Sequence, residues 1–153
     1  KSNHCVVTDT NTYLEVALVD SNEDADLSLI SVMVPPGLID RSIINSKCVT
    51  KDDELFDLDV IMSGFPLLYG PIFSRCKVCS PRMTLYFYTD AIVVQGVVER
   101  GHSGSLVRDA KTGKIVGMMG LFLIDGGYRL NNTFWCVPYH RISEFLEKNG
   151  IKT

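Results

Sequence analysis

Short runs of apolar residues, each ended after a few positions by Gly, Pro, Asn or Asp, make up most of the chain. The runs are rich in Val, Ile, Leu, Phe and Tyr, which favour strands over helices. This pattern predicts strands at residues 13–19, 27–34, 59–64, 72–78, 82–88, 92–98, 105–108, 115–123 and 133–137. We therefore expect an all-β fold with one exception near the C-terminus.

The exception is the segment 140–150, where the apolar spacing changes. Ile142, Phe145 and Leu146 recur at the period of one helix face, and Gly150 follows as a stop signal. A C-terminal helix is therefore predicted here.

Two other segments are predicted to be connections. Residues 109–114 separate two strands, and Gly113 can supply the unusual backbone angle of a hairpin turn. Residues 35–57 contain Pro-Pro-Gly and an acidic run without sustained periodicity. This connector would separate a first β unit at 1–34 from a second at 58–139.

Composition sets limits on the function. With 153 residues, 46% of them hydrophobic, the chain can bury a real core. Its formal charge is −3 and its Lys and Arg residues are scattered, so nothing indicates nucleic-acid binding. No apolar run is long enough to cross a bilayer, so membrane insertion is not predicted.

The five cysteines, Cys5, Cys48, Cys76, Cys79 and Cys136, are an odd number and do not form a dense disulfide framework. The spacing of Cys76 and Cys79 would suit half a zinc site, but no second Cys or His pair stands at ligand spacing. We interpret them as ordinary thiols on or beside a strand, and the compartment stays open.

The strongest chemical signal is Gly-His-Ser-Gly-Ser at 101–105, between two apolar strands. A serine hydroxyl needs a neighbouring base to become a nucleophile, and the developing oxyanion needs fixed backbone N–H donors. Gly101 lets the backbone bend so that its own N–H and that of Ser103 converge on one point. The alternative is a glycine-containing turn in which the serine is incidental.

The base would have to be one of three histidines. His102 adjoins the serine, but neighbouring side chains on a bent backbone usually diverge. His140 stands at the start of the predicted helix, where a surface or capping role is expected. His4 lies at the edge of an apolar run and is unremarkable in isolation.

A triad also needs a carboxylate that orients the imidazole. Asp26 stands at the start of an alternating strand, where it could lie half buried against the core. It could equally be a solvated member of the acidic stretch 23–26. The order His4, Asp26, Ser103, each at a strand edge, favours the catalytic interpretation.

This ordered set resembles the chymotrypsin/trypsin-like serine peptidases, closest to their HtrA/Deg-like branch, with the compact viral proteases as a second possibility. Five segments along nearly the whole chain carry the resemblance. They are Ser-Asn-His-Cys-Val at 2–6, Asp-Leu-Ser-Leu-Ile at 26–30, Gly-His-Ser-Gly-Ser at 101–105, Gly-Lys-Ile-Val-Gly at 113–117 and Phe-Trp-Cys-Val-Pro at 134–138.

The resemblance implies two antiparallel six-stranded β-barrels with the active site in the cleft between them. His4 would act as general base and then general acid, Asp26 would orient it, and Ser103 would form an acyl-enzyme with a protein or peptide substrate. Gly101, His102 and Ser103 would form the oxyanion loop. No cofactor and no metal is required.

The resemblance also assigns a substrate pocket. Its residues would be Val97, Gly120, Leu121 and Phe122, which carry no acid, so an uncharged and apolar preference is expected.

Two departures from the family pattern matter. Only three residues precede His4, where the family has about three strands, so the first barrel is expected to be incomplete in this chain. His102 replaces the Asp that trypsins pair with a new N-terminus, so that mode of activation is not supported.

A catalytically inactive peptide- or protein-binding module is the alternative function. An α/β-class esterase would need the order Ser, Asp, His.

Overall fold

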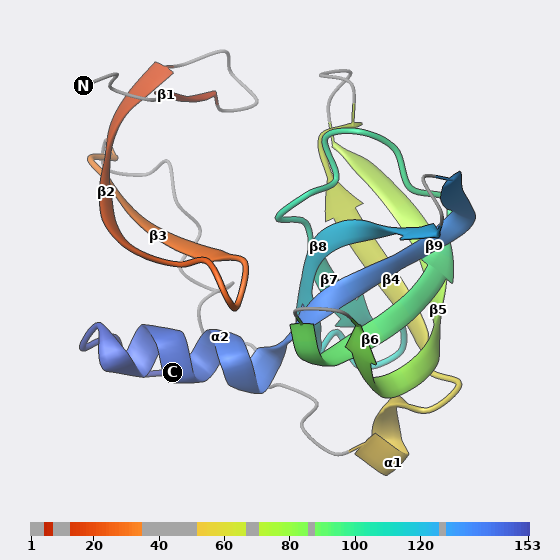
Figure 1. Cartoon of the computed structure of the whole chain (residues 1–153). Coiled ribbons are helices and arrows are strands. Elements are labelled where there is room, and N and C mark those ends of the chain that lie inside the picture. The colour runs from red at the N-terminus through yellow and green to blue at the C-terminus, as the bar shows by residue number, and fades with distance from the viewer. Residues whose placement is uncertain (1–4, 8–12, 35–51, 67–70, 86–87, 126–127) are drawn as a thin grey trace.

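The structure of the protein is a computed structural model that describes residues 5–7, 13–34, 52–66, 71–85, 88–125 and 128–153. A closed antiparallel barrel forms one half, and a strongly curved sheet with a C-terminal helix below it forms the other (Figure 1).

Six strands close the barrel in the order β4-β5-β6-β9-β8-β7. Their bounds are Asp59–Gly64 (β4), Ile72–Leu85 (β5), Tyr88–Gly96 (β6), Leu106–Asp109 (β7), Ile115–Asp125 (β8) and Tyr128–Pro138 (β9). Alternation along the strands fills the interior, as in β4, where Val60 and Met62 are fully buried and Asp59 is exposed. Close packing requires bare backbone at Gly117, where a Cβ would lie 2.3 Å from the carbonyl oxygen of Val137.

The second sheet has three strands in the order β1-β2-β3 within the described residues. They are Cys5–Val7 (β1), Tyr13–Asn22 (β2) and Leu27–Val32 (β3). β2 and β3 form a hairpin whose last pair is Asn22 and Leu27, so four residues make its loop. The sheet does not close within the described residues, whereas the other barrel does.

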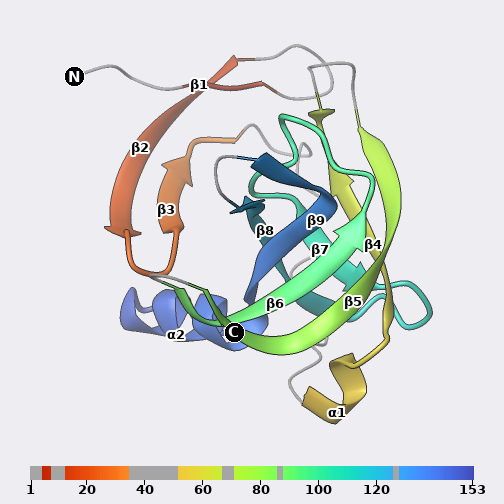
Figure 2. The ribbon, with the colours of Figure 1, turned by 45° about the vertical axis from the view of Figure 1, so that its right-hand side comes forward.

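The helix α2, Tyr139–Lys148, joins the two halves. Both views place it beside the β2–β3 hairpin (Figures 1 and 2). A small core forms at this junction from Leu27 of β3, Val137 of β9 and Phe145 of α2, all buried. The helix ends at Lys148, and Gly150 follows with a left-handed φ of 76° and an N–H that donates to the carbonyl of Glu147 at 2.9 Å.

The expected fold class is confirmed: one complete six-stranded antiparallel barrel, one incomplete sheet and a C-terminal helix. The turn at 109–114 is also confirmed, with Gly113 at a φ of 72°.

One element prediction was wrong. The strands expected at 72–78 and 82–88 form one long strand, β5. Register shifts in its pairing with β6 let the strand continue through the polar residues between the two predicted segments. The predicted connector 35–57 includes a short helix, α1, at Asp52–Leu55, and its residues 35–51 lie outside the described residues. In the described part of the chain, neither helix has the length and apolar character needed to cross a lipid bilayer.

Candidate active site

Ser103 lies on an exposed loop between β6 and β7. Glycines with left-handed backbone flank it, Gly101 with a φ of 98° and Gly104 with a φ of 80°. Residues with a Cβ rarely adopt these angles. The bend expected from the sequence is present, and it leaves the serine side chain exposed at the tip of the loop.

The backbone N–H groups of this loop fall into two classes. Those of His102, Gly104 and Ser105 donate to the carbonyls of Glu99, Met119 and His102, at 3.2, 2.8 and 2.8 Å. Those of Gly101 and Ser103 donate to no backbone carbonyl within the described residues. The N–H groups of Gly101 and Ser103 therefore have no backbone partner within the described residues, whereas that of His102 has one.

The loop is fastened to β8. Gly104 donates to the carbonyl of Met119, and Met119 donates to the carbonyl of Ser105, both at 2.8 Å. This reciprocal pair holds the backbone on both sides of the turn. Ser103 therefore has a defined position relative to residues 119 and 120 of β8.

Asp26 approaches β8 at Gly120, the residue after Met119. A Cβ added to Gly120 would lie 3.2 Å from Oδ2 of Asp26, so the carboxylate rests against bare backbone there. Asp26 occupies the last position of the β2–β3 loop with a φ of 54°, and its N–H donates to the carbonyl of Glu23 at 3.2 Å. The structure thus brings Asp26 and the loop of Ser103 to adjacent residues of β8.

Partial burial at this contact raises the pKa of Asp26 above its ordinary value. The residue as a whole is exposed, because it belongs to the loop between β2 and β3. The residues on either side of Asp26, Ala25 and Leu27, both contribute to the core at the junction of the two halves.

Two of the three histidines are engaged elsewhere. The ring of His102 is buried, 2% exposed, and its Nδ1 lies 3.1 Å from the backbone N of Glu99. Nε2 of His140 lies 2.6 Å from Oδ2 of Asp90, whose φ of 71° is left-handed. Both rings thus have partners other than Ser103 within the described residues.

His4 lies outside the described residues. The strand after it, β1, pairs Cys5 with Glu15, at the end of β2 opposite the hairpin loop. From Glu15 to Asn22 an extended strand spans roughly 23 Å. The structure therefore brings Asp26 and the loop of Ser103 to neighbouring residues of β8, and the role of His4 stays a prediction.

The predicted substrate pocket is described only in part. Val97 is 65% exposed, directly after β6. Gly120 is buried and contacts Asp26. Leu121 and Phe122 belong to β8, but their side chains lie outside the described part. The sequence analysis did not predict that Gly120 lies against Asp26. A small residue on the strand that follows a serine loop is the signal that could have indicated this contact.

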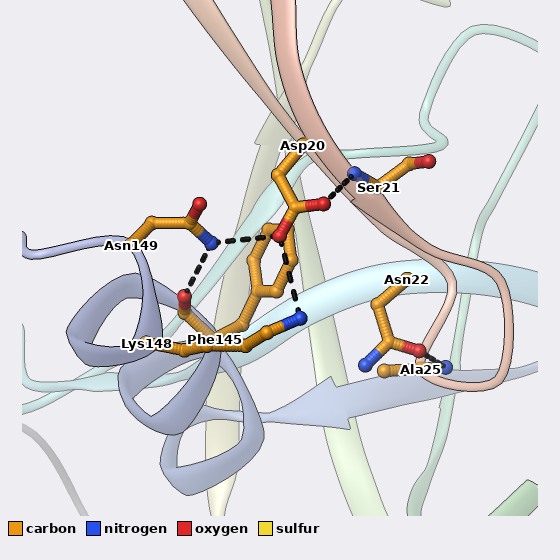
Figure 3. A network of polar contacts seen from close by, with 7 residues as sticks. All are labelled: Asp20, Ser21, Asn22, Ala25, Phe145, Lys148 and Asn149. Atoms are coloured by element: carbon orange, nitrogen blue, oxygen red, sulfur yellow. Dashed lines mark hydrogen bonds and ion pairs between the residues drawn. The ribbon is translucent and has the colours of Figure 1, made fainter.

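The hairpin that carries Asp26 is tied to α2 by a polar network (Figure 3). Asn149 donates from Nδ2 to Oδ2 of Asp20 at 3.0 Å and to the carbonyl of Phe145 at 2.9 Å. Lys148 adds an ion pair with Asp20 at 3.6 Å, and the N–H of Ser21 donates to the same carboxylate. The network fixes the end of β2 from which the Asp26 loop projects.

Asn149→Ala is expected to raise the pKa of Asp20 back toward 3.8, because the Asn149 hydrogen bond is the main cause of its lowering, ahead of the Ser21 N–H and Lys148. Since the folded pKa is depressed, the stability it contributes is present above pH 3.8 and is lost as pH falls through the folded value. NMR titration of the Asp20 carboxyl carbon measures the shift. Ser143→Ala, on the same helix but bonded to Glu147, is the control, and an unchanged titration in the Asn149 variant would contradict the network.

Cys76 and Cys79 lie on opposite faces of β5. Cys76 is buried in the barrel, and Cys79 is exposed. Burial raises the pKa of Cys76 to about 11, so it stays a thiol at neutral pH. With one sulfur inside the barrel and the other outside, the pair has no shared site for a metal ion.

Solved structures with the same fold include two proteases. The chain matches a structure described as HtrA-type protease AlgW with decapeptide at a TM-score of 0.73 and 18% identity, over 94% of this chain and 43% of that one. It matches the active form of the Rv3671c protease from M. tuberculosis at 0.71 and 18%, over 94% and 62%. The chain thus spans less than two thirds of either protein.

No protein-family model matches the chain, and no curated protein sequence is similar enough to match. The structural likeness confirms the expected chymotrypsin-like fold, which the HtrA-type protease AlgW shares. At this level of identity it establishes the fold alone.

Proposed function

We propose that the protein is a serine endopeptidase whose nucleophile is Ser103. Asp26 is the orienting carboxylate and His4 the general base. The observation that carries the proposal is the convergence at β8, where the loop of Ser103 bonds to Met119 and Asp26 rests against Gly120. Two different sheets thus contribute the carboxylate of Asp26 and the loop of Ser103 to neighbouring residues of β8.

The reaction follows from the roles of these groups. Ser103 Oγ attacks the scissile carbonyl carbon while His4 takes its proton, and the N–H groups of Gly101 and Ser103 bind the resulting oxyanion. Collapse breaks the peptide bond, His4 gives its proton to the leaving amine, and an acyl-enzyme forms. Water, deprotonated by His4, then releases the acid. Neither metal nor cofactor takes part in any step.

The substrate class is a polypeptide. AlgW, which shares the fold, is described as bound to a decapeptide. We extend peptide binding to this chain as part of the proposal. With Val97 and no acidic residue among the predicted pocket positions, the residue before the scissile bond is expected to be uncharged and apolar.

The proposal places a strict condition on the segment before β1. It requires His4 to reach the Asp26 loop, and His4 lies outside the described residues. The second candidate is a catalytically inactive module that binds peptides or proteins, in which Ser103 and Asp26 keep their positions without a base.

Reaction with a fluorophosphonate separates the two candidates. We expect the wild-type chain to be labelled at Ser103, located by peptide mass spectrometry, because only an activated serine attacks this reagent at a useful rate. Ser105→Ala is the matched control, since that neighbouring hydroxyl is buried and should not contribute. A folded wild-type chain without labelling would establish the inactive module instead.

A further inference from the structure

The ring of His102, next to Ser103 in the chain, is buried although it is polar. It is 2% exposed, and its Nε2 has no hydrogen-bond partner within the described residues. Buried polar atoms are nearly always paired, so an unpaired one in a native fold asks for an explanation. The explanation lies at the other ring nitrogen.

Nδ1 of His102 lies 3.1 Å from the backbone N and 3.0 Å from the backbone O of Glu99. The carbonyl of Glu99 already accepts the backbone N–H of His102 at 3.2 Å. The N–H of Glu99 has no other acceptor within the described residues. We assign the ring proton to Nε2, because Nδ1 then accepts the N–H of Glu99, and this assignment leaves Nε2–H without a partner.

These contacts tie residues 99 and 102 together in both directions, backbone to backbone and ring to backbone. Gly101 lies inside this closed turn with its φ of 98°. The carbonyl of His102 in turn accepts the N–H of Ser105 at 2.8 Å. Residue 102 therefore fixes the backbone next to Gly101 and Ser103, whose N–H groups have no backbone partner within the described residues.

The ring has room because of Gly64 on β4. A Cβ there would lie 3.2 Å from Cδ2 of His102 and 2.0 Å from Oγ of Ser105. Gly64 therefore leaves room for the buried ring. The side chains of Glu99 and Arg100, in the turn before the ring, are exposed.

We propose that His102 is a positioning residue, whose Nδ1 holds the Glu99–His102 turn so that the N–H groups of Gly101 and Ser103 point at a common oxyanion. The inference rests on the proposed function. His102 acts through the backbone and exchanges no proton with the substrate.

Three substitutions separate the two ring nitrogens. Asn places its carbonyl oxygen where Nδ1 stands, Gln places its own nearer to Nε2, and Leu removes the acceptor while keeping apolar volume. We expect His102→Asn to keep kcat within ~3-fold, and His102→Gln and His102→Leu to lower kcat by ~10- to 100-fold with less than ~3-fold change in KM, as for a weakened oxyanion site. Thermal unfolding of each variant verifies the fold.

The measurements are peptide turnover, the rate of fluorophosphonate labelling of Ser103, and hydrogen exchange at the Glu99 amide. Faster exchange in the Gln and Leu variants, but not in Asn, is expected with the loss of activity. Wild-type activity in a folded His102→Leu chain, or equal rescue by Gln and Asn, would overturn the proposal. An unlabelled wild-type chain would instead refute the proposed function, and the Glu99 exchange pattern would still decide the role of Nδ1.

Discussion

Ser103→Ala is expected to abolish peptide hydrolysis, with a loss of kcat on the order of 10⁶-fold. The substitution removes the attacking oxygen and leaves the loop intact, because the angles that shape it belong to Gly101 and Gly104. Turnover of a fluorogenic peptide, measured against the wild-type chain, gives the effect. Thermal unfolding should be unchanged, since Ser103 is exposed.

His4→Ala tests the same unit from its other side. Triad members act together, so its loss should approach that of Ser103→Ala, and the double variant should add little to either single one. His140→Ala is the matched control, because that ring is engaged with Asp90. Near-normal turnover by His4→Ala would remove His4 from the mechanism and would require another imidazole to serve as base.

Asp26→Asn is expected to lower kcat by roughly 10⁴-fold, because the amide no longer holds the imidazole in the required tautomer or stabilises its charged form. Asn is the substitution of choice here. It accepts the left-handed φ of 54° and has nearly the shape of Asp, so the contact with Gly120 is kept. Asp24→Asn, in the same loop, is the control.

The same variant should lose no stability. Burial raises the pKa of Asp26, so the folded chain binds its proton more tightly than the unfolded chain. Stability linked to this proton is present below the ordinary value of 3.8 and is lost as pH rises through the folded pKa. At neutral pH the ionised carboxylate therefore opposes folding, and Asn relieves it. We expect an equal or higher Tm, and a fall of several degrees would contradict this reading of the site.

Strands bounded by strong turn signals were predictable from sequence. The predicted strand 59–64 coincides with β4, and the Gly113 turn lies where expected, because alternation and turn chemistry are local properties. β5 was not predictable as one strand. Its polar middle resembles a loop, and only the ladders to β4 and β6 reveal that register shifts carry the strand through it.

The candidate site shows the same division. The bend at Ser103 follows from its flanking glycines, which is why the motif was informative by itself. The inward turn of His102 depends on Gly64, some 40 residues earlier. The contact of Asp26 with β8 depends on the packing of Leu27 against Val137 and Phe145. Contacts between distant segments leave no periodic trace in the sequence.

The junction formed by Leu27, Val137 and Phe145 has a consequence for when the protein is competent. Its three members come from β3, β9 and α2, so residues far apart in the sequence hold the two halves together. In the proposed mechanism, Asp26 lies against β8 only while this junction is formed. Undocking of α2 would therefore inactivate the proposed site without changing any residue of the loop around Ser103.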